Sequence, residues 1–281
     1  MKILSLLVHS PVGTLVLLLG LTFSSSFADE PKLQGPKMGL QTWTCRNMSF
    51  DEVVVFSTHH KIKYIQFIAK HLDPDAPPAE TLRKKAILDK QGLVAYSFGV
   101  NRTLLDKEVN RKLFEFARLL GIKVIVVEPK NLAEWDNLEA LVKEYNIKLA
   151  IHNHGAGSVY GDPATVKKIL AERDSRIGVC LDVGWITAAG FDAAAVFRDY
   201  GNRVYDIHFK DKIVQKSSDG KLTPVDTEIG RGNANYSGLF SEMRKIGWSG
   251  VLAIETDSKA FAEDPNRLVT EAVAYFQRSF P

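Results

Sequence analysis

Short apolar runs alternate with longer stretches of mixed polarity through most of the chain. Most of these runs show no strict alternation of apolar and polar positions, which is typical of parallel strands covered on both faces. The predicted strands span residues 39–44, 64–68, 93–98, 124–128, 149–154, 178–182, 204–208 and 251–255. Strands that alternate with helices in this way over about 250 residues predict a single (β/α)8 TIM barrel.

Helix-start signals lie between the predicted strands. The clearest are Ser49 with Glu52 in capping-box spacing, Asp162 before Pro163, and Asn131 before a helix that begins at Leu132. The last helix is predicted over residues 265–280. A doubly wound open sheet is the alternative, but the turn after the first strand lacks the glycine pattern of a dinucleotide-binding loop. We therefore expect one barrel and no second domain.

The N-terminal segment differs from the rest of the chain. Lys2 precedes an apolar stretch that is densest at residues 12–23, and Ser26 and Ala28 place small side chains just before an expected cut. This is the pattern of a secretory signal peptide. An uncleaved membrane anchor is the alternative, although the apolar run is shorter than the roughly 20 residues that span a bilayer.

The chain therefore divides into three expected segments: a signal peptide at 1–28, a polar lead at 29–38 and the barrel at 39–281. The signal peptide predicts an exported protein, located in the periplasm or outside the cell. No stable membrane insertion is expected after cleavage.

Composition limits the classes of function. Hydrophobic residues make up 45% of the chain and charged residues 25%, as in a globular protein with one large core. The 36 basic and 33 acidic residues are dispersed and leave a formal charge of +3, so no nucleic-acid partner is expected. Cys45 and Cys180 fall in or beside predicted strands. Two buried thiols are expected there rather than a disulfide, which an oxidising compartment would permit.

Metal-binding or acid/base side chains stand at the ends of the last five predicted strands. They are Glu128, His152 with His154, Asp182, His208 and Glu255. The carboxyl ends of parallel barrel strands meet at one face, where TIM-barrel enzymes build their sites. These side chains are therefore expected to line one pocket.

Six short motifs carry a resemblance to a known family. They are VVEPK (126–130), IHNHG (151–155), CLDVGW (180–185), IHFKD (207–211), IGRGN (229–233) and AIET (253–256). In this order and at these strand ends they resemble the sugar phosphate isomerase/epimerase superfamily, with its xylose isomerase-like TIM barrel. The similarity runs from about Gly39 to the C-terminus.

The resemblance implies a set of metal ligands. In such barrels a carboxylate on strand five, an aspartate on strand six, a histidine on strand seven and a glutamate on strand eight commonly hold a divalent cation. Asp182, His208 and Glu255 match the last three. His152 stands where many relatives have the strand-five carboxylate, and Glu128 on the neighbouring strand could supply a replacement. The fourth ligand is left open between these two.

Two departures from the family pattern bear on mechanism. Many relatives have a histidine shortly after the strand-six aspartate, where this chain reads Val183-Gly184-Trp185. Many also have an acidic residue on strand two, where this chain has Gln66. An epimerase mechanism that uses two glutamates is therefore not expected.

The residue types point to metal-assisted proton transfer. Carboxylates with one or two imidazoles suit Mn²⁺, Co²⁺, Zn²⁺, Fe²⁺ or Ni²⁺ better than Ca²⁺. Such a cation stabilises the enediolate that forms when the carbon next to a sugar carbonyl loses a proton. The candidates for proton transfer are Glu128, His152 and His154, and Lys210 is expected to bind a substrate oxygen or stabilise its charge. The alternative is that these residues have structural roles. Glu128 would then be solvated, a histidine of the fifth strand would support its neighbour, and Lys210 would form an ion pair at the rim.

Trp43, Trp185 and Arg231 are the candidate substrate-binding residues. The tryptophans, together with Phe67 and Phe98, could wall the pocket and stack on a sugar ring, although core packing is the more common use of such residues. The loop around Arg231 could bring backbone donors or the guanidinium to an anionic group, or be a simple turn. Three further histidines are expected at the surface or on helices: His59, His60 and His71.

Three functions stay open. The first is a metal-dependent sugar isomerase or epimerase, and the second is a dehydratase or 3-keto-glycoside lyase that uses the same chemistry, as some exported proteins that it resembles do. The third is a non-catalytic sugar-binding barrel. Because free phosphorylated sugars are scarce outside the cytoplasm, we expect a neutral sugar or keto-glycoside as the small-molecule partner. The oligomeric state is left open.

Overall fold

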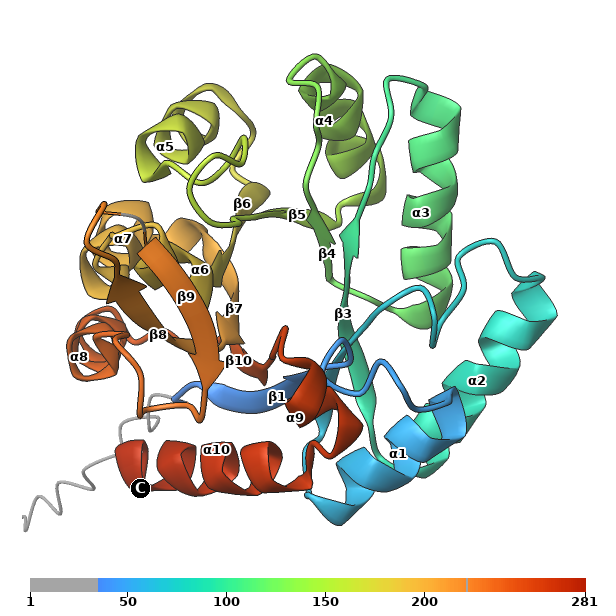
Figure 1. The fold of residues 1–281 in the computed structure, drawn as a ribbon. Helices are drawn as coiled ribbons and strands as arrows, with labels where there is room; N and C mark the ends of the chain where they lie inside the picture. Colours follow the sequence, from blue (N-terminus) through green and yellow to red (C-terminus); the bar gives the residue numbers. More distant parts are fainter. Residues whose placement is uncertain (1–34, 221) are drawn as a thin grey trace, which may run out of the picture. The chain divides into compact units, whose positions relative to one another are not determined.

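All the predicted strands are present, in the predicted order, in the computed structural model, which describes residues 35–220 and 222–281. The barrel strands are β1 (Lys37–Gln41), β2 (Tyr64–Phe67), β3 (Val94–Asn101), β4 (Val124–Val127), β5 (Lys148–His152), β6 (Ile177–Asp182), β7 (Val204–Phe209) and β10 (Val251–Ile254). Neighbours in this order pair in parallel, and β10 pairs with β1 to close the barrel (Figure 1). The predicted (β/α)8 barrel is confirmed.

The expected signal peptide at 1–28 lies outside the described residues, as does most of the expected lead at 29–38. Within the part of the chain that the structure describes, no helix is both long and apolar enough to cross a membrane.

Several strands begin or end at other residues than predicted. β1 begins at Lys37 and ends at Gln41, because Thr44 donates its backbone N–H to the carbonyl of Gln41 and closes a turn there. β4, β5 and β10 end one or two residues before the polar residues that close the predicted strands. Those polar residues consequently lie at the mouth of the barrel, where the backbone N–H groups of Glu128 and Glu255 still donate to the neighbouring strands.

Helices follow the strands and surround the barrel (Figure 1). Those in the described residues are α1 (Phe50–His59), α2 (Pro78–Lys90), α3 (Lys107–Leu120), α4 (Glu134–Tyr145), α5 (Pro163–Glu172), α6 (Val183–Ala188), α7 (Ala193–Tyr200), α8 (Tyr236–Lys245), α9 (Lys259–Glu263) and α10 (Asn266–Ser279), with the 3-10 turn η1 (Gly201–Arg203). The last helix therefore falls within its predicted range of 265–280.

The capping signals at α1 and α5 are confirmed. The backbone N–H of Glu52 donates to Ser49 Oγ at 3.3 Å, and the N–H of Ser49 donates to the Glu52 carboxylate at 2.7 Å. Asp162 accepts a hydrogen bond from the first turn of α5. These bonds satisfy backbone donors that have no partner within the helix.

The predicted start of α4 is wrong by two residues. The helix begins at Glu134 rather than at Leu132. Asn131 Oδ1 accepts the N–H of Ala133 at 3.0 Å, so this side chain stabilises a turn that precedes the helix.

Two apolar layers build the core. The larger lies between the barrel and its helices, where Phe67 contacts the ring of Phe50 on α1 and Phe98 contacts that of Phe116 on α3. Neither Phe67 nor Phe98 lines the pocket described below, so their alternative use in core packing is the correct one. The smaller layer fills the barrel interior with Val124, Val126, Ala150 and Cys180.

Both cysteines are free and buried. The expectation of two buried thiols is confirmed. Burial raises the pKa of the Cys45 thiol to about 12, which keeps this group protonated and unreactive.

A hairpin that the sequence analysis did not predict interrupts the alternation after β7. β8 (Asp211–Lys216) and β9 (Leu222–Thr227) pair antiparallel and contact α6 (Figure 1). Asp226 on β9 binds the Lys212 ammonium and accepts the backbone N–H of Asp257 at 2.6 Å. The hairpin is thereby tied to the segment that follows β10. Its strands escaped prediction because polar and charged residues dominate them.

Candidate active site and metal cluster

The period of a β-strand directs alternate side chains of β7 into the barrel. Asp206, His208 and Lys210 are two residues apart and all buried, while Ile207 and Phe209 belong to the core that contacts the helices. The segment therefore places three polar side chains inside the barrel, at every second position along the chain.

Asp182 at the end of β6 is the centre of a buried polar cluster. Its Oδ2 lies 3.5 Å from His152 Nε2, 3.3 Å from His208 Nδ1 and 3.2 Å from Lys210 Nζ. Its Oδ1 accepts the N–H of Trp185 at 2.8 Å and so caps α6. One carboxylate thus joins three strand ends and a helix start.

A network behind the cluster fixes the ring of His208. His208 Nε2 lies 2.6 Å from Gln66 Oε1, and the Gln66 amide nitrogen donates to Asp206 and to Ser97. An oxygen faces each ring nitrogen, and the contact at Nε2 is the shorter, 2.6 Å against 3.3 Å from Nδ1 to Asp182, so the proton of the neutral ring is assigned to Nε2 and Nδ1 directs its lone pair at Asp182. Gln66 therefore sets the tautomer of a histidine next to the candidate metal site.

Burial keeps both buried histidines neutral at neutral pH. Desolvation lowers the pKa of His152 to about 4, and it also lowers the pKa of His208. Metal ions bind the neutral imidazole, so both rings are available as ligands. His152 Nδ1 is also buried and has no hydrogen-bond partner among the described residues. Such an unpaired polar atom is uncommon in a folded protein.

Three of the predicted ligands come together in a geometry that fits a divalent cation. One ligand atom from each of His152, Asp182 and His208 lies within 4.8 Å of the other two. The His208 lone pair faces a carboxylate oxygen with no proton between them, an arrangement that a cation stabilises. Two nitrogens and one oxygen suit divalent first-row transition metals from Mn²⁺ to Zn²⁺.

Glu255 is buried but does not join these ligands. Its carboxylate contacts the ammonium of Lys210, which also lies 2.9 Å from Asp257 Oδ2. Although burial lowers the pKa of Lys210, the surrounding carboxylates outweigh this effect and raise it above its ordinary value. Among the described residues, no convergent group of metal-binding side chains includes Glu255. The geometry therefore does not match its predicted role as a ligand.

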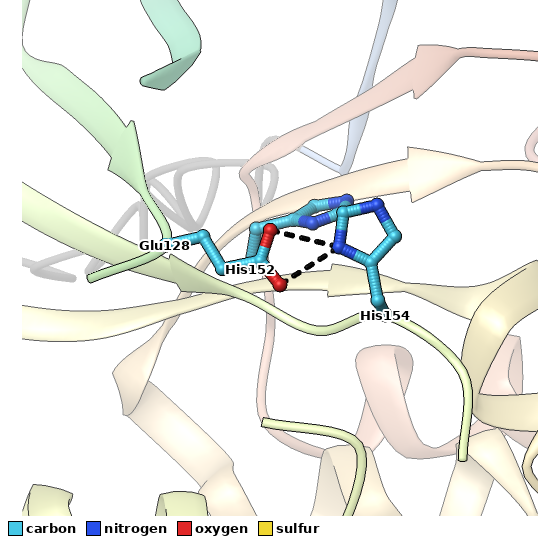
Figure 2. A group of neighbouring side chains, drawn as sticks. All are labelled: Glu128, His152 and His154. Atoms are coloured by element: carbon cyan, nitrogen blue, oxygen red, sulfur yellow. Dashed lines mark hydrogen bonds and ion pairs between the residues drawn. The ribbon is translucent and has the colours of Figure 1, made fainter. Parts of the chain in front are cut away.

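Glu128 and His154 form a second, more exposed pair (Figure 2). His154 Nδ1 lies 2.8 Å from the Glu128 carboxylate, and the two side chains are 42% and 24% exposed. This hydrogen bond raises the pKa of His154 above the ordinary value for histidine. His152 lies beside the pair and offers a ligand atom within 4.8 Å of both. A histidine that a carboxylate orients and solvent reaches is suited to general base catalysis.

A pocket with a volume of ≈ 670 Å³ opens at this end of the barrel, a size that suits a small ligand. The candidate residues that line it are Trp43, Glu128, His152, His154, Trp185, His208, Lys210 and Glu255. Both predicted tryptophans therefore lie at the pocket, and the Trp185 ring lies 5.7 Å from that of His154. Asp182 is fully buried beneath the lining residues.

Arg231 does not reach this pocket. Its side chain is 67% exposed, and its guanidinium lies 3.8 Å from the carboxylate of Glu271 on α10. The neighbouring backbone N–H groups of Gly230 and Gly232 donate to Asp211 at 3.0 and 2.8 Å. Asp211 already accepts the backbone donors of this loop, and the substrate-binding role of Arg231 stays a prediction that the pocket lining does not support.

Two residues of the site were missed in the sequence. Lys212 Nζ lies 4.1 Å from the centre of the Trp185 ring and 3.2 Å from Asp257 Oδ2. Asp257 in turn contacts Lys210 and lines the pocket. The alternation of polar residues at 206, 208, 210 and 212 was the available signal for Lys212. No comparable pattern marks Asp257, which the hairpin positions.

The prediction for His71 is also wrong. It was expected at the surface or on a helix, but its side chain is buried in the turn after β2, 3.2 Å from the carbonyl oxygen of Met48. Burial lowers its pKa to about 4. His59, by contrast, is exposed on α1 as expected.

A comparison with protein families identifies the fold family. A family model described as xylose isomerase-like TIM barrel matches residues 59–279. The chain belongs to this family. The match includes every candidate site residue except Trp43, which lies before it. The superfamily resemblance of the strand-end motifs is therefore confirmed.

Known members share the fold at low identity. An inosose dehydratase from Clostridium perfringens (strain 13 / Type A) is 26% identical over 239 residues, which cover 70% of this chain and 80% of that protein. The IolI protein, solved with a zinc atom, has a TM-score of 0.69 at 16% identity and covers 86% of this chain and 97% of its own. A D-allulose 3-epimerase from Methylomonas sp. has a TM-score of 0.68 at 14% identity and covers 88% and 99%. The chain thus belongs among barrels whose named members modify sugar-like molecules.

Proposed function

We propose that this protein is a lyase that eliminates water or an alcohol from a keto-sugar, a keto-polyol or a 3-keto-glycoside. The observation that carries the proposal is the Glu128–His154 pair, which opens into the pocket beside the buried cluster around Asp182. An acid/base pair next to a cation site is the arrangement that proton abstraction beside a carbonyl requires.

His154 is the proposed base. Glu128 holds its Nδ1 at 2.8 Å, so the proton of the neutral ring resides on Nδ1 and Nε2 has the free lone pair. Nε2 removes the proton from the carbon next to the carbonyl. A double bond then forms to the neighbouring carbon as its oxygen substituent leaves, and the protonated His154 is placed to return a proton to that oxygen.

His152, Asp182 and His208 are the proposed ligands of a divalent Mn, Co, Zn, Fe or Ni ion. When bound, such an ion acts as a Lewis acid that stabilises negative charge on a substrate oxygen. The chain itself contributes two neutral imidazoles and one buried carboxylate, and Gln66 holds the ring of His208 in the tautomer that binds metal. The relative solved with zinc supports a metal in this fold.

The single Glu128–His154 pair favours elimination over epimerisation. Epimerisation returns the proton to the opposite face of the carbon and therefore needs a second acid/base group across the substrate. Glu255, the other glutamate at the pocket, contacts Lys210 and is 4% exposed. Elimination can use one group for both proton transfers. The similarity to an inosose dehydratase supports the same choice.

A sugar isomerase or epimerase is the second candidate. One base can also move a proton between two adjacent carbons, which is the reaction of an aldose–ketose isomerase. The fold similarity to a D-allulose 3-epimerase favours keeping this candidate. A non-catalytic sugar-binding barrel is the third, and the oriented, solvent-accessible His154 argues against it.

We also propose that the protein is exported and meets its substrate outside the cytoplasm. The pattern of residues 1–28 supports this placement, and it favours an unphosphorylated sugar or glycoside as substrate. Mass spectrometry of the protein secreted by an expressing cell should find a mature chain that begins at Asp29. A chain that retains Met1 in the membrane fraction would contradict export with cleavage.

The function is tested by incubating the metal-loaded protein with keto-polyols and 3-keto-glycosides in D₂O and following the reaction by NMR. A lyase releases the leaving group and forms an unsaturated ketone. Deuterium incorporation with no leaving group released would instead identify an isomerase or epimerase. Binding of a sugar with neither event would indicate the non-catalytic barrel. The Glu128→Gln variant is the matched control, because it retains size while it removes the carboxylate.

A further inference from the structure

The Lys210 ammonium lies inside the barrel, among carboxylates that could otherwise bind a metal ion. Its ammonium lies 3.2 Å from Asp182 and 2.9 Å from Asp257, and it also contacts Glu255. The Lys210 side chain is 2% exposed. Three carboxylates from the ends of β6 and β10 therefore surround one buried positive charge.

The stem of Lys210 reaches this position through a space that Gly184 leaves open. A Cβ atom at Gly184 would lie 2.6 Å from Lys210 Cγ and 2.7 Å from its Cδ, closer than carbon atoms can approach. The ammonium also lies 5.6 Å from the centre of the Trp185 ring. The residues after Asp182, which depart from the family pattern, thus form the channel that holds this lysine.

A second lysine and the hairpin hold Asp257 against the ammonium. Lys212 Nζ lies 3.2 Å from Asp257 Oδ2, and the backbone N–H of Asp257 donates to Asp226 on β9. The contact between Lys210 and Asp257 is therefore supported by both strands of the hairpin, β8 and β9.

We propose that the Lys210 ammonium is a built-in cation of this site and keeps Glu255 out of the metal-binding set. A divalent ion then has His152, Asp182 and His208 as its protein ligands, and it shares Asp182 with the ammonium. Two cations bound to one carboxylate repel each other, so Lys210 also weakens the binding of the ion. The site combines a weakly held metal with a permanent charge that faces the pocket.

Because Lys210 and Glu255 lie outside the proposed metal ligands, Lys210 has a role of its own in the proposed reaction. Its ammonium lines the pocket together with His154, so a substrate oxygen can bind it without displacing a metal ligand. The inference rests on the proposed function in assigning the Asp182 cluster to a metal. Metal affinity can nevertheless be measured without turnover, so a failure of the proposed reaction and a failure of this inference give different results.

The test is a titration of Zn²⁺ and Mn²⁺ into the purified protein at neutral pH, in competition with a chromophoric chelator. Lys210→Met removes the charge and keeps most of the stem, and it should raise the metal affinity about tenfold or more. Glu255→Gln should change the wild-type affinity by about threefold or less, because Glu255 is not a ligand. In the double variant only part of the gain should disappear, because Glu255→Gln removes the carboxylate that Lys210→Met frees for the metal, whereas the relief of repulsion at Asp182 remains.

Several results would overturn the inference. They are an affinity in Lys210→Met equal to or below that of wild type, a loss of about tenfold or more in Glu255→Gln alone, and metal binding in none of the proteins. Metal binding in Lys210→Met but not in wild type would support it. Circular dichroism and thermal unfolding establish that each variant is folded. Glu255→Gln is nearly isosteric and tests the ligand set even if Lys210→Met does not fold.

Discussion

The histidines at the pocket show how depth within one barrel changes the same side chain. His154 is 42% exposed and hydrogen-bonded to Glu128, which raises its pKa. His152, two residues earlier at the end of β5, is buried, and desolvation lowers its pKa to about 4. One position therefore suits proton transfer and the other suits metal binding. Residue type alone does not separate these roles.

The two regions also differ in what holds them together. The buried cluster depends on Asp182, which contacts His152, His208 and Lys210 at once. In the Glu128–His154 pair, His154 Nδ1 lies 2.8 Å from both carboxylate oxygens of Glu128, and the pair has solvent on its open side. Changes in the first region should therefore affect stability and metal binding together, whereas changes in the second should affect mainly the reaction.

The largest effect is expected from Asp182→Asn. Removal of this charge leaves the Lys210 ammonium with fewer partners and deprives the two histidines of the carboxylate they face, so we expect a loss of about 3–5 kcal/mol in the free energy of unfolding. Metal should be lost as well. Urea denaturation and elemental analysis measure the two effects, with the double variant Asp182→Ala/His208→Ala as the limiting case. Full metal content in either variant would contradict the cluster as the metal site.

The next effect is on turnover alone. His154→Asn should lower kcat by about 10²–10⁴-fold, the usual contribution of a general base. Metal content should stay at the wild-type value, because His154 is outside the buried cluster, and the melting temperature should fall only slightly, through loss of the hydrogen bond to Glu128. A parallel loss of metal would mean that His154 is itself a ligand and would remove the contrast between the two regions.

The pH profile sharpens the contrast further. The base acts when deprotonated, and Glu128 raises the pKa of His154, so kcat/KM should rise with pH around a midpoint above the ordinary value for histidine. Glu128→Gln should move this midpoint to lower pH. The same pair stabilises the fold at pH below the unfolded-state pKa of His154, and that contribution is lost as pH rises through the raised folded-state pKa. An unchanged midpoint in Glu128→Gln would exclude His154 as the titrating base.

The smallest effect is expected from Arg231→Ala. This side chain is exposed and lies 3.8 Å from Glu271, far from ideal ion-pair geometry. The free energy of unfolding should change by about 0.5 kcal/mol or less. kcat/KM with a neutral substrate should be the same as in wild type. A marked rise in KM would show that Arg231 contributes to substrate binding.

Much of the barrel was predictable because parallel strands that are buried on both faces appear in sequence as apolar runs. The polar residues at the strand ends were predictable for the same reason, since they interrupt those runs. The hairpin β8–β9 was not, because charged residues such as Lys212 and Asp226 interrupt its strands and leave no apolar run. The late start of α4 depended on one local hydrogen bond from Ala133 to Asn131.

The chain order of apolar and polar residues by itself determined the barrel and the face at which the site lies. Only the tertiary structure decided which strand-end side chains meet. In the sequence, Glu255 and His208 are equivalent as candidate ligands. In the structure, Glu255 contacts the Lys210 ammonium, whereas His208 faces Asp182. Periodicity is a local property that orients each side chain relative to its own strand. Pairing depends on distances of a few ångströms between strands and on the space left by Gly184, which no local pattern records.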